Sequence, residues 1–261
     1  NEGLISTPLD ALRGRVSGVS IPVGGNSAAA LAAVRVRGTT SLTGGNDPLV
    51  IIDGVFADLN LLSSIYPADI ENFTILKDAS ETAQYGSRGA SGVIEVTTKK
   101  GRQGAFSISY DGSFGVEAAY KSLDMLSANG FRKLAEERNI GILDLGNNTD
   151  FQDEITRLGL VQNHHIAFGG GSSYRASLGF VEREGVIRNT NSRNFTTKLN
   201  ITQHAFNDLL VFDLGIFGSL LKNAYLNDVQ KMFYSAATFN PTFPNHKNME
   251  TGSWDQITNA S

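Results

Sequence analysis

The chain has 261 residues, with 22 basic and 26 acidic side chains, a net charge of −4 and no cysteine. This balanced charge, without a long basic run, excludes the footprint of a nucleic-acid-binding protein, and the lack of cysteine excludes disulfides and thiolate metal sites. No stretch reaches the ~18 consecutive apolar residues of a transmembrane helix. Transmembrane strands remain open, because they need only about 9–11 residues and give a weak alternating pattern.

Residues 1–104 mix short helical and strand patterns, which predicts an α+β domain. Leu49–Ile52 is a continuous apolar run typical of a strand buried on both faces. Gly14 and Gly86 each follow a helical stretch at the place where a helix ends. The expected helical segments are residues 8–13, 67–71 and 78–85, and the expected strands are residues 34–38, 49–52, 73–76 and 92–98.

From Ala105 onward apolar residues alternate with polar ones, which predicts strands with one apolar and one polar face. The alternating segments are residues 106–117, 164–168, 173–180, 194–201 and 210–220. One amphipathic helix, N-capped by Ser127 and running to Arg138, interrupts them. Such strands fit a barrel wall with lipid outside and a polar lumen inside. They also fit a soluble antiparallel sandwich whose apolar face lies in a core. The length of the strands favours the barrel.

Four motifs of the first domain occur in the order found in the plug domain of TonB-dependent outer-membrane transporters, in the SusC/RagA-like branch of the Bacteroidetes. They are Leu-x-Gly-Arg-Val-x-Gly-Val at 12–19, Val-Arg-Val-Arg-Gly at 34–38, Pro-Leu-x-x-x-Asp-Gly-Val at 48–55, and the segment from Asp-Ile-Glu to Gly-Val-Ile at 69–94. Segments 150–155, 162–165 and 184–187 also match. The chain therefore resembles this family over residues 8 to about 203.

The resemblance implies an α+β plug domain over residues 1–104, followed over residues 105–261 by the first strands and loops of a transmembrane β-barrel of antiparallel strands. Barrels of this class close at roughly 22 strands, far more than this chain supplies. An open set of strands leaves unpaired backbone groups in a bilayer, so we expect the chain to be part of a longer protein. The energy-coupling peptide of the family is not recognisable in it.

The function implied by the resemblance is active import of an oligosaccharide or a peptide across the outer membrane. The expected partners are TonB, a SusD-like surface lipoprotein, the substrate and outer-membrane lipid, with no nucleic acid and no cofactor. No catalytic pattern stands out, so we do not expect an enzyme. The alternative that the residues leave open is an exported, soluble, β-rich module that binds a glycan or another protein.

Two polar turns of the expected plug are candidates for substrate contact. They contain Asn46 and Asp47 in the first turn, and Asp58 and Asn60 in the second. Their side chains can hydrogen-bond to sugar hydroxyls or peptide amides. The alternative is ordinary turn chemistry, because Gly, Asn and Asp are the common turn formers.

Three arginines, Arg35, Arg37 and Arg88, are candidate anchors between the plug and carboxylates of the barrel wall. An anionic ligand is the alternative partner for them. The glycine-rich turn 86–92 follows a helix and opens a strand, the reverse of a phosphate-binding loop. His164 and His165 are adjacent and should face opposite sides of a strand, which disfavours a shared metal and favours a solvated structural role.

Overall fold

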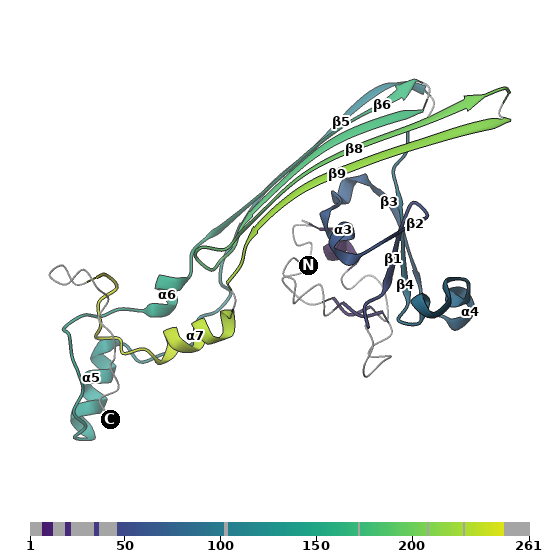
Figure 1. Ribbon diagram of the computed structural model, residues 1–261. Coiled ribbons are helices and arrows are strands. Elements are labelled where there is room, and N and C mark those ends of the chain that lie inside the picture. Colours follow the sequence, from purple (N-terminus) through teal and green to yellow (C-terminus); the bar gives the residue numbers. More distant parts are fainter. Residues whose placement is uncertain are drawn as a thin grey trace. The chain divides into compact units, whose positions relative to one another are not determined.

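The computed structural model describes residues 7–12, 19–21, 34–36, 46–101, 104–171, 173–207, 209–226 and 228–247 (Figure 1). The chain forms two compact units. The first contains Asn1–Gly115, Val161–Arg183 and Ser192–Asn223, and the second contains Val116–Leu160, Glu184–Asn191 and Ala224–Ser261. Among the described residues, no helix combines the length and the apolar character needed to cross a membrane.

The first part of the chain forms a four-stranded sheet, here called the small sheet, in the order β2-β1-β4-β3. Its strands are β1 (Leu49–Ile52), β2 (Val55–Ala57), β3 (Ile70–Leu76) and β4 (Val93–Thr98). The central strand β4 pairs in parallel with β1 and antiparallel with β3. Three of the expected strands are present, although β3 starts earlier than its sequence pattern indicated. The expected strand 34–38 is described only at 34–36, where Arg35 forms a single bridge with Ser20.

Short helices connect and cover the small sheet. They are α1 (Pro8–Leu12), α3 (Leu59–Ser64), η1 (Pro67–Asp69), α4 (Ala79–Thr82) and η2 (Ala83–Gly89). Asp78 and Glu81 form a capping box at the start of α4, which satisfies backbone N–H groups at both positions. Helix α3 was not predicted from the sequence. It begins where the carboxylate of Asp58 accepts a hydrogen bond from the N–H of Leu61 at 2.7 Å.

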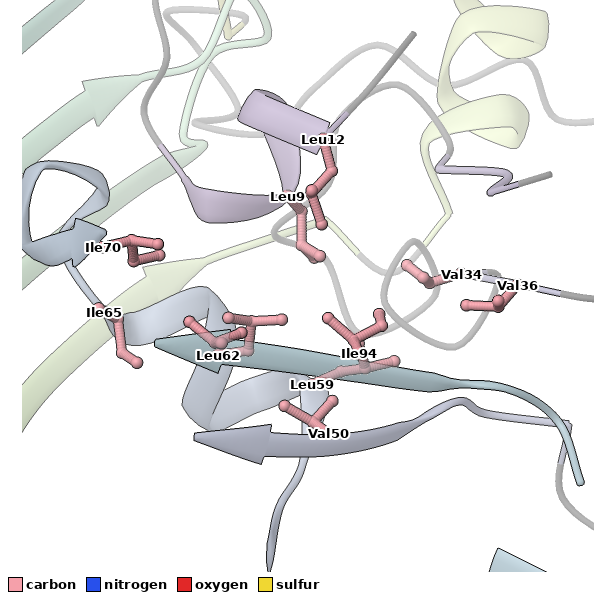
Figure 2. Packing of buried hydrophobic residues seen from close by; sticks show 11 residues of the cluster. Leu9, Leu12, Val34, Val36, Val50, Leu59, Leu62, Ile65, Ile70 and Ile94 are labelled. Atoms are coloured by element: carbon pink, nitrogen blue, oxygen red, sulfur yellow. The ribbon is translucent and has the colours of Figure 1, made fainter. Parts of the chain in front are cut away.

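The core of this part is an apolar cluster from α1, α3, the segment 34–36 and the small sheet (Figure 2). Val50 and Ile94 lie on neighbouring strands, and both are 0% exposed. Figure 2 shows Leu9 and Leu12 of α1 above those strands, with Leu62 of α3 beside them. Burial on both sides explains why β1 and β4 read as nearly continuous apolar sequence.

The second sheet, here called the long-strand sheet, has five antiparallel strands in the order β5-β6-β7-β8-β9. They are β5 (Gly104–Glu117), β6 (Gly159–Gly171), β7 (Tyr174–Glu184), β8 (Asn191–Ala205) and β9 (Leu210–Ala224). Figure 1 shows them running side by side. Each has 11 to 15 residues, which is long compared with the 5–6 residues or so of an average strand. The alternating segments of the sequence correctly predicted all five.

On β6, β7 and β8 the long-strand sheet buries one face, which carries most of the polar side chains, whereas most residues of β5 and β9 are exposed on both faces. On β8, Asn194, Thr196 and Lys198 are buried, at 8%, 2% and 7% exposure, whereas Phe195 between them is 47% exposed. The apolar side chains of β5 follow the same rule, with Phe114 at 74% exposure. In a water-soluble sandwich the alternation would run the other way. The apolar face of this sheet therefore lacks the core that a soluble sandwich would provide.

The connection between β5 and β6 carries the helices α5 (Ala128–Glu137) and α6 (Phe151–Ile155), and the helix α7 (Val229–Thr238) follows β9. Helix α5 was predicted, and Ser127 caps it by accepting a hydrogen bond from the N–H of Gly130 at 3.2 Å. Phe239 makes edge-to-face contacts with Phe151 and Phe243, which join the segments of α6 and α7. The segments around α6 and α7 thus have a small apolar cluster of their own.

We expect Ile94→Ala to destabilise the small sheet by about 2–5 kcal/mol, because it removes a fully buried side chain and leaves a cavity. The measurement is the opening free energy of β1 and β4 amides by hydrogen exchange in the full-length protein. Thr97→Ala, an exposed position on the same strand, should stay within about 0.5 kcal/mol. Equal effects of the two substitutions would contradict this core.

Candidate functional site: the polar contact between the two sheets

Asp69, the last residue of η1, is the centre of the contact between the two sheets. Its carboxylate is hydrogen-bonded to the Nε2 of His165 at 3.1 Å, the Nη2 of Arg175 at 2.8 Å and the hydroxyl of Ser177 at 2.8 Å. Asp69 is 3% exposed and His165 is 1% exposed. The three partners belong to β6 and β7, so one carboxylate binds two strands of the long-strand sheet.

The partners of Asp69 decide its charge. Burial alone raises the pKa of this carboxyl, but the hydrogen bonds from His165, Ser177 and Arg175 and the charge of His165 outweigh burial and bring the pKa below 3.8, its ordinary value. The carboxylate can be ionised although it is buried, because a cationic guanidinium and two further hydrogen-bond donors face it. The site is therefore a buried, ionised hydrogen-bond centre.

Tyr66 seals one side of this centre. Its ring stacks on the His165 ring with centroids 4.5 Å apart and an interplanar angle of 15°. The ring also lies over Gly179, where an added Cβ would come within 2.7 Å of the Tyr66 ring. Burial and then the negative charges of Asp111 and Asp69 raise the pKa of Tyr66 to about 12. Tyr66 thus stays neutral, and its ring packs against His165 of β6 and Gly179 of β7.

Asp53 forms a second contact in which an acid of the small-sheet part faces a base on a long strand. This residue and Gly54 have φ values of +50° and +85°, as a two-residue type I′ hairpin between β1 and β2 requires. Its carboxylate accepts hydrogen bonds from the backbone N–H (2.8 Å) and the hydroxyl of Thr98. The Nζ of Lys198, on the buried face of β8, lies 3.7 Å from the same carboxylate.

Two further polar contacts join the end of α3 to β8 and the end of β4 to β9. The side-chain amide of Asn194 donates to the carbonyl of Ser64 at 3.0 Å, one of the carbonyls that a helix end leaves unpaired. Lys100, just after β4, pairs with Asp213 on β9 at 3.3 Å, with both side chains half exposed. The small sheet is thus bound to β6, β7, β8 and β9 through polar groups.

A cavity of about 400 Å³ separates the two sheets beside these contacts. Its lining is mixed, with polar residues such as Lys198 and Asn200 and apolar residues such as Phe56 and Phe217. Phe217 of β9 also packs against the apolar cluster of the first part of the chain, so the contact between the two sheets combines polar pairs, apolar packing and a cavity. Among the described residues, no group of His, Cys, Asp and Glu side chains is arranged to hold a metal ion.

The four candidate substrate residues occupy two separate places. Asp47 pairs with Arg35 at 3.1 Å, and Asn46 is its neighbour in the chain. Asp58 is the N-cap of α3, and Asn60 is an exposed residue in the first turn of that helix. The capping bond accounts for Asp58 without a ligand. Contact of these residues with a substrate stays a prediction.

The candidate anchor arginines contact the small-sheet part of the chain. Arg35 pairs with Asp47, and the guanidinium of Arg88 lies 5.6 Å from the centroid of the Phe56 ring. Arg37 lies outside the described residues. Their anchoring role stays a prediction, since the contacts with the long-strand sheet described above come from other residues.

The sequence did not predict the pairs that join the sheets. Arg175 and Lys198 are basic residues at the polar positions of alternating segments. This position alone could have indicated that they face the inside. His164 and His165 do face opposite sides, as predicted, because His164 contacts Tyr110 and Phe114 while His165 contacts Asp69. The expected solvated role is wrong for His165, which is 1% exposed and contacts Tyr66 and Asp69.

We expect the contact at Asp69 to weaken in acid. The pKa of Asp69 is lower in the folded protein than in the unfolded chain. The contact therefore stabilises the fold at pH values above the unfolded pKa, and this contribution is lost as the pH falls through the folded pKa. Hydrogen exchange of η1 and β3, corrected for the intrinsic effect of pH, should show falling protection below about pH 4. Asp69→Asn should lack this component, and an equal loss in wild type and variant would contradict the assignment.

Comparison with known proteins gives a consistent result. A family model described as the TonB-dependent Receptor Plug Domain matches residues 3–93. The chain is 37% identical, over its whole length, to the TonB-dependent receptor SusC of Bacteroides thetaiotaomicron, of which it covers 28%. It is 37% identical over 73% of its length to the TonB-dependent receptor P3 of Formosa agariphila, of which it covers 19%.

Solved structures agree with this fold. The structure of the RagAB peptide transporter matches 90% of this chain and 31% of its own, with a TM-score of 0.78 and 23% identity. The RagAB peptide importer in the closed-closed state matches 86% of this chain and 30% of its own, with a TM-score of 0.74 and 25% identity. The chain spans less than a third of the length of these relatives and structures. The small sheet with its helices corresponds to a plug and the long-strand sheet to an unclosed part of a barrel wall, and the chain belongs to the SusC/RagA-like TonB-dependent receptors.

Proposed function

We propose that this chain supplies the plug, over residues 1–104, and part of the wall, over residues 105–261, of an outer-membrane transporter that imports a nutrient. The observation that carries the proposal is the direction of burial in the wall strands. Polar side chains of β6, β7 and β8 contact the plug, while aromatic side chains such as Phe114 and Phe195 are exposed. A barrel strand in lipid needs this arrangement, with apolar residues outward and polar residues toward the lumen.

The lengths of the connections suggest the orientation of the wall. At one end of the strands the connections are short, with β6 and β7 joined by residues 172–173 and β8 and β9 by residues 206–209. At the other end, residues 118–158 form a long connection that contains α5 and α6. Outer-membrane barrels place short turns in the periplasm and long loops outside the cell. We therefore assign α5 and α6 to the cell surface.

Energy and partners follow from the family. Import would be driven by the inner-membrane proton gradient through TonB, and a SusD-like lipoprotein would cover the outer opening. A polar lumen suits a substrate rich in hydrogen-bonding groups, which an oligosaccharide and a peptide both are. Relatives that bear the names SusC and RagAB peptide transporter support the class of transporter.

A soluble glycan- or protein-binding module is the second candidate. It would need another layer to cover the apolar face of the wall strands. Side chains such as Phe106, Tyr110 and Val116 are 60%, 63% and 65% exposed along a single strand. A contiguous apolar band of this kind is unusual for a soluble monomer. The exposure of this face therefore favours the membrane-embedded barrel.

In intact cells that carry the complete transporter, we expect uptake of its substrate to collapse when the proton gradient is dissipated with an uncoupler. Surface abundance of the transporter, measured in the same cells, should stay constant and serves as the control. Uptake that persists at full rate without the gradient would contradict active import. Uptake that depends on the gradient but persists without the lipoprotein would contradict the proposed partner alone.

The proposed substrate contact of the second polar turn can be separated from its role in the fold. Asn60→Ala should reduce substrate affinity by about 1–3 kcal/mol if the side chain pairs with the ligand, and it leaves the helix cap intact. Asp58→Asn preserves capping, whereas Asp58→Ala should also cost about 0.5–2 kcal/mol of stability. Affinity is measured on the purified transporter, with surface abundance as the control. Normal affinity in Asn60→Ala and Asp58→Asn would leave only the turn-forming role.

A further inference from the structure

The plug touches the wall through few buried charges, and Asp69 is the most buried acid among them. The hydrogen-bond partners of its carboxylate, His165, Arg175 and Ser177, lie on the wall, on β6 and β7. Within the described part of the plug, the hydrogen bonds of Asp69 are made by its backbone, since its carbonyl accepts from the N–H of Lys99 at 2.8 Å and its N–H donates to the carbonyl of Tyr66 at 3.0 Å. The side chain therefore serves the contact with the wall.

The wall is shaped to receive this group. His165, Arg175 and Ser177 come from alternate, inward-facing positions of two paired strands, where Ala167 pairs with Ser177 and Gly169 with Arg175. Gly179, two residues further on the same face, leaves the space in which the Tyr66 ring lies. The carboxylate of Asp69 and the ring of Tyr66 thus fit side by side into a complementary surface of β6 and β7.

We propose that Asp69 is the latch of the plug: its carboxylate holds the plug against β6 and β7 in the closed transporter, and opening requires its release. The inference rests on the proposed function, because a latch matters only for a plug that moves. A merely structural Asp69 would support the internal fold of the plug. The arrangement of its hydrogen bonds points instead to the boundary between plug and wall.

The latch is tested by the access of reagents to a wall position that the plug covers. Thr196 on β8 is 2% exposed and lies beside Tyr66 and Gly179. The chain has no cysteine, so Thr196→Cys, in a complete transporter freed of any other cysteine, gives a single reporter thiol. Its rate of labelling by a polar maleimide in outer-membrane vesicles without TonB energy measures how often the plug leaves the wall.

We expect Asp69→Asn to increase the labelling rate at position 196 by roughly a hundredfold or more, because it removes the anionic partner of a buried cation. Asp111→Asn is the matched control. Asp111 is also an acid near this centre, 3.8 Å from the Nδ1 of His165, but it lies on the wall strand β5 and its side chain is 65% exposed. This control should leave the rate close to that of the parent. Equal rates in the two variants would overturn the latch.

If Asp69→Asn fails to reach the outer membrane, Ser177→Ala provides the test, because it removes one of the hydrogen bonds and keeps the ion pair. It should increase the labelling rate by a smaller factor, and an unchanged rate would overturn the proposal. Hydrogen exchange of β1 and β4 in the same variants should stay at the parent level, whereas a matching loss of protection there would assign Asp69 to the plug core. The labelling experiment does not depend on uptake. A negative labelling result would therefore overturn the latch without contradicting gradient-driven import, and a negative uptake result would contradict import without changing the labelling result.

Discussion

The structure depends on one constraint, which is that the long-strand sheet turns its polar face toward the plug. Successive side chains on a strand point to opposite faces, so burying Asn194, Thr196 and Lys198 forces the residues between them, such as Phe195, outward. The plug must therefore meet hydroxyls, amides and cations rather than aliphatic side chains. A buried polar group is costly unless it is hydrogen-bonded, and a buried charge is costlier still. The plug must consequently present partners at defined places.

The buried charges of this interface are divided by sign between its two sides. The acids Asp53 and Asp69 lie on the plug, and their basic partners Lys198 and Arg175 lie on the wall. Each acid stands where the local backbone fixes it, Asp53 in a hairpin turn with positive φ and Asp69 at the end of a short helical turn. Fixing the backbone reduces the entropy lost when the carboxylate binds its partners. This explains how two short, loop-like elements can carry the most buried ion pairs of the contact.

Sequence reasoning predicted the elements whose pattern is local and missed the contacts that are not. Leu49–Ile52 is apolar throughout and proved to be a strand covered on both sides, and the alternation of the later segments predicted all five long strands, even where it was short, at 164–168, or had a mixed second face, at 210–220. Helix α3 was missed because its apolar residues follow a three-residue strand too closely for a periodic pattern to develop. The partners of Asp69 lie 96 to 108 residues away in the sequence. No local pattern links residues so far apart, and the candidate arginines were chosen on charge alone.

An interface of this kind is suited to a plug that must be both closed and removable. An apolar interface gains stability in proportion to its buried area, at about 25 cal/mol per Å², and resists separation everywhere along that area. A polar interface gains little net free energy from each exchanged hydrogen bond, because water offers the same groups an alternative. Its specificity is nevertheless high, since leaving one buried charge unpaired costs about 3–5 kcal/mol. The contact between plug and wall combines a few such charges and the apolar packing of Phe217 with a cavity, so water that enters the cavity can take over the hydrogen bonds one group at a time.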